Sequence, residues 1–127
     1  MHVLVADDNA INLHVVLAML KRCGCTTVTV HDGQEALAAL AQQPFDLVLM
    51  DCHMPNLDGF EATRRLRAMP GPVASTRVVA LTASVLSEEL AQCRTAGMDD
   101  VLTKPLTLAD LEKALQRSRP DQLTGSP

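Results

Sequence analysis

Apolar residues gather in short runs along this chain, and stretches with helical spacing separate the runs. The runs span residues 3–6, 26–30, 47–50, 78–82 and 101–103, and most of them are continuously apolar rather than alternating. Continuous apolar runs of this length are typical of strands buried on both faces of a parallel sheet. Because right-handed crossovers join such strands, the pattern predicts an α/β fold with a five-stranded parallel sheet and helices on both faces.

Capping residues mark where several of the helices begin and end. Asp32, Asp58 and Thr107 each precede a helical stretch and are followed three positions later by an acidic residue, as in a capping box. Gly97 stands where a helix should end in the left-handed conformation. The segment 69–72 contains two prolines and should end the third helix and open a loop.

The helix expected after the first strand carries more apolar residues than one buried face needs. One row has the i, i+3, i+4, i+7 spacing of a stripe that faces the sheet: Leu13, Val16, Leu17 and Leu20. A second row lies on a neighbouring face: Ile11, Val15 and Met19. The second row either widens the buried stripe, an alternative that applies most to Met19, or leaves Ile11 and Val15 exposed as a contact surface.

Length, charge and composition describe an ordinary soluble domain. The 127 residues suit one domain, which we place at 1–117 with a linker-like tail at 118–127. A net charge of −4 and an aromatic content of 2% argue against nucleic-acid binding, which favours basic and stacking side chains. No apolar run approaches the roughly 18 residues of a membrane span, and no signal peptide is visible. We therefore expect a cytoplasmic domain without direct membrane contact, whose four cysteines are free thiols.

Groups suited to phosphate chemistry follow four of the five expected strands. They are Asp7 and Asp8 after the first strand, Asp51 after the third, Thr82 at the end of the fourth and Lys104 after the fifth. In an open α/β sheet the carboxyl ends of the strands share one edge, and ligands bind there. Each of these residues alone has an ordinary structural explanation, but their occurrence together indicates a site.

The three carboxylates of this set repel one another and together require a cation. Hard oxygen ligands suit Mg²⁺, which also accepts phosphate as a ligand. The set thus offers a carboxylate nucleophile, a site for a divalent ion, and a lysine and a threonine to hold phosphate oxygens, which suits phosphoryl transfer. Neither glycine-rich nucleotide motif is present, so the expected donor is not a nucleotide bound by this chain.

Five sequence blocks together resemble the receiver domain of bacterial two-component response regulators. They are VADDNAIN (5–12), DGQEAL (32–37), DLVLMDCHMPNLDGFEATRRLR (46–67), VVALTAS (78–84) and AGMDDVLTKP (96–105). The resemblance implies the flavodoxin-like (βα)5 fold with strand order 2-1-3-4-5. The DDNxxN and GMDD patterns are more similar to receivers attached to hybrid sensor histidine kinases than to those of DNA-binding regulators.

The resemblance assigns the acidic residues of the predicted site to two roles, acceptance of the phosphoryl group and binding of the metal. Asp51 matches the aspartate that accepts the phosphoryl group, with Mg²⁺ as the implied cofactor. Asp8 matches the acidic residue that binds the metal directly, and Asp7 matches its neighbour, which acts through water. Asp51 and the backbone carbonyl of His53 complete the implied metal site.

The resemblance assigns the remaining site residues to binding of the phosphoryl group. Thr82 matches the hydroxyl that moves to bond this group, and Lys104 matches the lysine that pairs with it. In the family the bond from this lysine to the following proline, here Pro105, is usually cis. Many receivers also carry Tyr or Phe three residues before the lysine as a rotating switch, whereas this chain has Val101. Its output should instead depend on the loop after Thr82 and on the fourth helix.

The resemblance also implies the phosphodonor and the surface that binds it. Receivers take the phosphoryl group from a phosphohistidine of a histidine kinase or of a histidine phosphotransfer domain. They bring the start of their first helix against the histidine-bearing bundle, which makes Ile11 and Val15 the expected docking residues. The implied function is a phosphoacceptor in a phosphorelay, a monomer when isolated, that catalyses only its own phosphorylation and dephosphorylation. If the chain is part of a hybrid kinase, the kinase activity lies outside it.

Two other functions share features of this chain. An aspartate-nucleophile phosphatase of the haloacid dehalogenase type also combines Asp and Mg²⁺, but it needs Asp-x-Asp after the first strand, whereas Asp51 follows the third and precedes Cys52 and His53. A receiver that signals by docking without phosphorylation usually lacks an acidic-pair residue, the acceptor or the lysine. Because this chain has all of them, phosphorylation is the favoured prediction.

Overall fold

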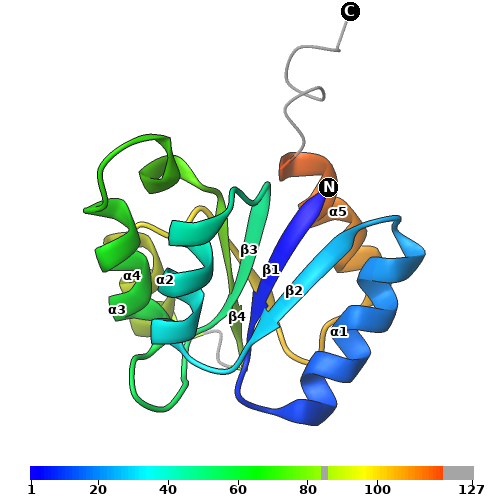
Figure 1. Ribbon diagram of the computed structural model, residues 1–127. Coiled ribbons are helices and arrows are strands. Elements are labelled where there is room, and N and C mark those ends of the chain that lie inside the picture. Colours follow the sequence, from blue (N-terminus) through cyan, green and yellow to red (C-terminus); the bar gives the residue numbers. More distant parts are fainter. Residues whose placement is uncertain (84–85, 119–127) are drawn as a thin grey trace, which may run out of the picture.

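The computed structural model describes residues 1–83 and 86–118 and contains one parallel sheet (Figure 1). Its strands are β1 (His2–Ala6), β2 (Thr26–Val30), β3 (Leu47–Asp51), β4 (Val78–Thr82) and β5 (Asp100–Thr103), in the spatial order β2-β1-β3-β4-β5. Every neighbouring pair of strands is parallel. The predicted α/β class, the five strands and their order are therefore confirmed.

Five α-helices cover the two faces of the sheet. They are α1 (Ala10–Arg22), α2 (Gly33–Gln42), α3 (Gly59–Arg67), α4 (Ser87–Ala96) and α5 (Leu108–Ser118). Figure 1 shows α1 and α5 on one face and α2, α3 and α4 on the other. Ser118 is the last described residue, so the rest of the expected tail, 119–127, lies outside the described part of the chain. None of the described helices is long and apolar enough to cross a membrane.

Side chains that alternate along the strands build a separate core on each face of the sheet. In β1, Leu4 and Ala6 belong to the cluster under α2, α3 and α4, while Val3 and Val5 belong to the cluster under α1 and α5. Successive side chains of a strand point to opposite faces, so a strand between two helical layers must be apolar throughout. This explains the continuous apolar runs in the sequence.

Polar side chains cap the helices at the carboxyl edge of the sheet. The carboxylates of Asp32 and Asp58 accept the backbone N–H groups of the residues three positions on, at 2.8 and 2.9 Å, as predicted. Thr107 accepts the N–H of the residue three positions on in α5, also as predicted. Asn9, which was not predicted as a cap, accepts two N–H groups in the first turn of α1.

Helix α1 presents the two apolar rows differently from each other. Leu13, Val16 and Leu20 are buried against the sheet, but Leu17, which was expected beside them, is only half-buried. Met19 packs against the core instead, so the second row widens the buried stripe at that position. Its other two members, Ile11 and Val15, are 76% and 44% exposed.

The connection between α3 and β4 contains a short helix that was not predicted. Helix α3 ends at Arg67, and a 3₁₀ helix, η1 (Pro72–Ser75), forms where a loop was expected. Pro72 starts η1, a position that proline favours because its missing N–H is not needed there. Arg67 holds this connection by donating to the carbonyl oxygens of Ala74 and Thr76.

A glycine at the start of α3 allows that helix to approach β3. A Cβ atom on Gly59 would overlap the carbonyl oxygen of Asp51, whereas a Cβ on Gly24 would meet nothing within 4 Å. We predict that Gly59→Ala lowers the free energy of unfolding by about 3 kcal/mol, because the helix must shift away from the strand. Gly24→Ala should cost only about 1 kcal/mol, for its left-handed backbone. Urea denaturation of both variants tests this ranking, and equal losses would contradict it.

The four cysteines are free thiols, as expected, but they differ in burial. Cys23 and Cys25 are half-buried, whereas Cys52 and Cys93 are buried, with their Sγ atoms 3.8 Å apart. Burial raises the pKa of the Cys52 thiol and also that of Cys93, and the thiolate is the reactive form. We predict that a thiol reagent modifies two cysteines quickly in the native protein and all four after unfolding. Modification of all four at one rate in the native protein would contradict this assignment.

Candidate functional site

The residues predicted for the site lie together at the carboxyl edge of the sheet. Asp51 is the last residue of β3, rather than the residue after it, and pairs in register with Leu81 of β4. Thr82 ends β4 and pairs with Thr103, so Lys104 begins the loop just beyond. The parallel register therefore brings the acceptor candidate, the hydroxyl and the ammonium to the same level of the sheet.

Three carboxylates form a cluster that could hold a metal ion. Asp7, Asp8 and Asp51 each offer an oxygen atom, and these atoms lie within 4.8 Å of one another. Asp7 and Asp51 are 1% and 5% exposed, whereas Asp8 is open to solvent. The Oδ2 atom of Asp7 is buried without a hydrogen bond to the described part of the chain. A buried, unsatisfied carboxylate oxygen in an all-oxygen cluster fits a hard divalent cation such as Mg²⁺.

Lys104 faces this cluster from the loop after β5. Its Nζ donates to Oδ2 of Asp51 at 3.1 Å and lies 3.5 Å from Oδ2 of Asp7. Burial alone would lower the pKa of Lys104, but the hydrogen bond and charge of Asp51, with the charge of Asp7, outweigh it and raise that pKa. The lysine is therefore an ammonium ion at neutral pH, and it is available to bind phosphoryl oxygens.

Asp51 is a buried member of the carboxylate cluster, and its side chain is held on both oxygens. Burial raises the pKa of its carboxyl, and the negative charge of Asp7 adds to this, while the hydrogen bond from Lys104 opposes it. The backbone N–H of His53 donates to the other oxygen, Oδ1, at 3.2 Å. Both carboxylate oxygens thus have fixed directions, which prepares the group for attack on a phosphorus atom in line.

The side chain of His53 has a contact that the sequence did not indicate. Its Nε2 lies 2.5 Å from Oε1 of Glu89 on α4, and its ring meets Phe60 of α3 edge-on at 5.9 Å. Glu88 and Glu89 look equivalent in the sequence, since both are acidic residues of the first turn of α4. Only the placement of α4 beside the loop after β3 distinguishes them.

Two further expectations concern the strand and loop next to Lys104. The bond between Lys104 and Pro105 is cis, as the resemblance implied. Val101 is partly buried and packs against the core under α2, α3 and α4. An aromatic side chain that rotates between two positions is therefore absent from this place in β5.

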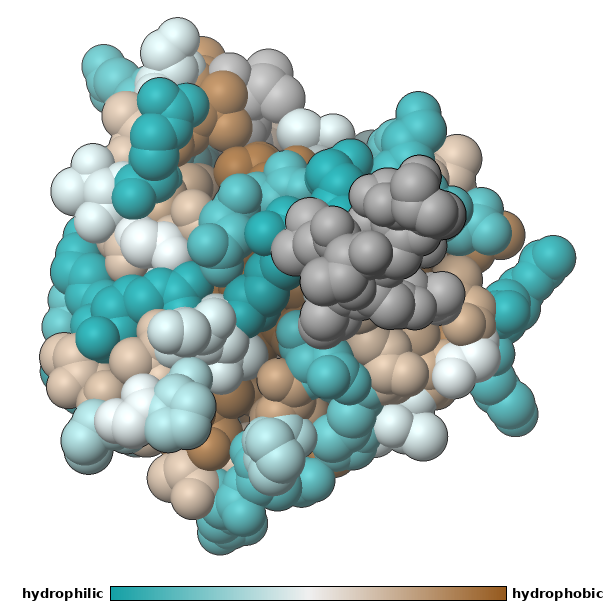
Figure 2. All heavy atoms as spheres, turned by 90° about the horizontal axis from the view of Figure 1, so that it is seen from above, coloured by the Kyte–Doolittle hydropathy of each residue, from teal (hydrophilic) through white to brown (hydrophobic). Residues whose placement is uncertain are grey.

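The opposite end of the sheet carries none of these groups. A hollow of about 600 Å³ lies there between the α2–β3 and α3–β4 connections, with Phe45, Asp46, Pro72 and Arg77 among its lining residues. Figure 2 views the molecule from this end. None of the residues predicted for the site lines this hollow.

Comparison with known families identifies the chain. The family model of the response regulator receiver domain matches residues 3–116. The chain belongs to the response regulator receiver family. This receiver domain is therefore a phosphoacceptor domain of two-component signalling, as the resemblance implied, and the reading as a haloacid dehalogenase-type phosphatase is not supported.

Curated relatives of the receiver domain are longer signalling proteins. It is 41% identical over 115 residues to the sensor protein GacS of Pseudomonas syringae pv. syringae, covering 89% of this chain and 13% of that protein. It is 37% identical over 122 residues to the transcription factor SKN7 of Saccharomyces cerevisiae, covering 96% of this chain and 19% of that protein. The chain thus spans less than a fifth of the length of these relatives.

Two solved structures share the fold of this receiver domain. The receiver domain of a sensor histidine kinase of Pseudomonas aeruginosa PAO1, with magnesium coordinated in its active-site cleft, is 40% identical with a TM-score of 0.86, covering 91% of this chain and 94% of that one. A complex of the Saccharomyces cerevisiae phosphotransfer protein Ypd1 with the receiver domain of Ssk1 is 28% identical with a TM-score of 0.86, covering 96% and 90%.

Metal addition should stabilise this receiver domain measurably. At a Mg²⁺ concentration ten times its Kd, binding to the folded state alone adds about 1.4 kcal/mol to the free energy of unfolding. For a domain of this size the melting temperature should rise by roughly 5 °C. Asp8→Ala removes an exposed member of the carboxylate cluster and should abolish the rise, which differential scanning calorimetry measures. A rise that is unchanged in Asp8→Ala would place the metal elsewhere.

Proposed function

We propose that this receiver domain accepts a phosphoryl group on Asp51 from a phosphohistidine, with Mg²⁺ bound by Asp8, Asp51, the backbone carbonyl of His53 and, through water, Asp7. The observation that carries the proposal is the environment of the Asp51 carboxylate. It lies within 4.8 Å of two other carboxylates and 3.1 Å from the Lys104 ammonium. Among the described residues, this is the carboxylate that combines a nucleophile, a cation site and a fixed positive charge.

The transfer needs little covalent chemistry from the protein. An Asp51 oxygen bonds to phosphorus, the bond from phosphorus to the donor's imidazole nitrogen breaks, and that nitrogen keeps the electron pair. Bound Mg²⁺ would neutralise charge on the phosphoryl oxygens. Lys104, already paired with Asp51, would bind one of these oxygens, and the hydroxyl of Thr82 at the end of β4 would bind another. Hydrolysis of the resulting acyl phosphate ends the signal.

The exposed start of α1 supports a protein donor. Ile11 and Val15 are exposed although they are large and apolar. A pocket of about 140 Å³ is lined by Val15, Leu106 and Lys104, among others, and so links the surface of α1 to the site. We assign Ile11 and Val15 to docking of a histidine kinase or histidine phosphotransfer domain. Exposed apolar residues next to a site are typical of such contacts.

The direct test is phosphorylation by a small phosphodonor. Incubation of the domain with acetyl phosphate and Mg²⁺ should add one phosphoryl group, measured by intact mass. The same incubation with a chelator in place of Mg²⁺ should add none. A domain that stays unmodified under both conditions would favour the alternative of a receiver that signals by docking alone. Turnover of a generic phosphate ester would instead favour an enzyme.

A further inference from the structure

Two consecutive residues after Asp51 have side chains that point in opposite directions, and both contact helix α4. Cys52 points into the core, where its sulfur lies 3.8 Å from that of Cys93 on α4. His53 points outward, and its ring bonds Glu89 on α4. Glu89 and Cys93 are four residues apart and so lie on one face of the helix. That face of α4 is therefore held against the segment that follows Asp51.

The His53–Glu89 contact is the outer of these two attachments, and its burial is unequal. The His53 side chain is 70% exposed, whereas that of Glu89 is 15% exposed, so the glutamate is the more buried partner. A neutral imidazole can donate its Nε2–H to a carboxylate, so the contact does not require a charged ring. The ring is further restrained by its edge-on contact with Phe60.

The main chain of His53 is part of the expected metal site. Its N–H donates to Asp51 at 3.2 Å, and its carbonyl is the one that Mg²⁺ would use. Mg²⁺ demands near-ideal octahedral geometry, so the direction of a carbonyl ligand affects its affinity. The preceding residue, Cys52, is already fixed, because its N–H donates to Leu81 and its carbonyl accepts from Gly59. The direction of the His53 carbonyl group is what remains to be set.

We propose that Glu89 is a positioning residue of the magnesium site: by bonding the His53 ring it fixes the main chain of His53 beside Asp51. This inference rests on the proposed function for the identity of the metal. It gives α4 a direct connection to the phosphoacceptor loop in a chain that has Val101 instead of a switching aromatic residue. Because coupling between two sites is reciprocal, metal binding should in turn hold α4 more firmly.

Calorimetric titration with Mg²⁺ tests the proposal without phosphorylation, and it suits a chain that has no Trp or Tyr. Glu89→Ala should weaken Mg²⁺ binding about tenfold, as loss of an outer partner of a metal ligand does. Glu89→Gln keeps an acceptor oxygen for His53 and should stay within about twofold of the unmodified domain. His53→Ala should weaken binding about as much as Glu89→Ala, and the double variant no further, because both remove the same bond.

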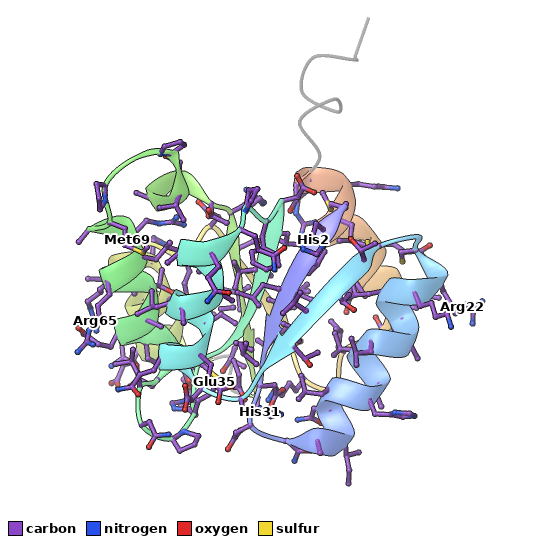
Figure 3. All side chains as sticks on the ribbon, viewed as in Figure 1. His2, Arg22, His31, Glu35, Arg65 and Met69 are labelled. Atoms are coloured by element: carbon purple, nitrogen blue, oxygen red, sulfur yellow. The ribbon has the colours of Figure 1, made fainter. Side chains whose placement is uncertain are left out.

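Two controls separate positioning from charge. Glu88→Ala removes the same charge from the same turn of α4, where the side chain is exposed, and should leave Mg²⁺ affinity unchanged. His31 and Glu35 form a second, exposed histidine–glutamate pair, with Nδ1 and Oε1 3.3 Å apart (Figure 3). His31→Ala should also have no effect. Equal weakening by Glu88→Ala and Glu89→Ala, or no rescue by Glu89→Gln, would overturn the proposal.

Hydrogen exchange supplies a second measurement. Mg²⁺ should slow amide exchange in α4 of the unmodified domain, and this slowing should be lost in Glu89→Ala. If the unmodified domain binds no Mg²⁺, the metal part of the proposed function fails, and exchange without metal decides the role of Glu89. Residues 52–54 and α4 should then exchange faster in Glu89→Ala than in Glu88→Ala, and equal rates would overturn the positioning role.

Discussion

Replacing Asp51 with asparagine should abolish phosphorylation by both small and protein phosphodonors. The amide of asparagine is a poor nucleophile, and no second carboxylate of the cluster has the same surroundings. Lys104 donates to Oδ2 of Asp51 at 3.1 Å, whereas it only approaches Asp7. Intact mass after incubation with acetyl phosphate and Mg²⁺ should show no addition to the variant. Phosphorylation of Asp51→Asn at the same rate as the domain with Asp51 would refute the assignment.

The fold of this variant should survive, which makes the loss of phosphorylation interpretable. A raised pKa in the folded state means that the Asp51 carboxyl favours folding when it is protonated. That contribution is present below the ordinary pKa of aspartate and is lost as the pH rises through the folded pKa. At neutral pH the charged carboxylate therefore opposes folding, and Asp51→Asn should melt at a temperature no lower than the unmodified domain.

A matched control lies at the other end of the same strand. Asp46 precedes β3, is exposed and accepts the backbone N–H of His2. Asp46→Asn makes the same chemical change away from the carboxylate cluster and should be phosphorylated normally. Loss of phosphorylation in both variants would point to a general effect on the domain rather than to the acceptor.

The strand pattern was sufficient to predict the α/β class and the parallel sheet because the sheet is buried on both faces, whereas the strand order came from the resemblance. In β1 and β3 every position from Val3 to Ala6 and from Leu47 to Met50 faces a helix, so the apolar runs are continuous. The parallel arrangement then brings residues from separate strands to one edge, and the convergence of Asp7, Asp51 and Lys104 could be predicted from that rule alone. The roles within the cluster came from the resemblance.

Features that depend on how helices sit against loops could not be predicted. Leu17 has the spacing of the buried stripe, but it is only half-buried, whereas Leu13 and Val16 are buried. The His53–Glu89 contact joins residues 36 positions apart through the placement of α4. No local pattern specifies that placement, since a neighbouring glutamate has the same propensity and charge.

Changing Ile11 and Val15 together to aspartate should impair transfer from a protein donor and spare transfer from a small one. The two side chains stand exposed at the start of α1, 76% and 44%, and neither contributes to the buried core. Charges placed in an apolar contact must lose water without gaining a partner, which at the centre of an interface costs roughly 2 kcal/mol or more. Transfer from the phosphorylated partner at subsaturating concentration should therefore fall about thirtyfold.

The comparison of two phosphodonors determines what such a loss means. Acetyl phosphate reaches Asp51 without docking, so its rate of labelling should be unchanged in the double variant, and the far-ultraviolet circular dichroism should match that of the unmodified domain. Ala18→Asp adds a charge at another exposed position of α1 and should leave both rates intact, which controls for charge on the helix. Equal losses with both donors would mean that Ile11 and Val15 serve the fold. An unchanged rate with the protein donor would place its docking surface on another part of the domain.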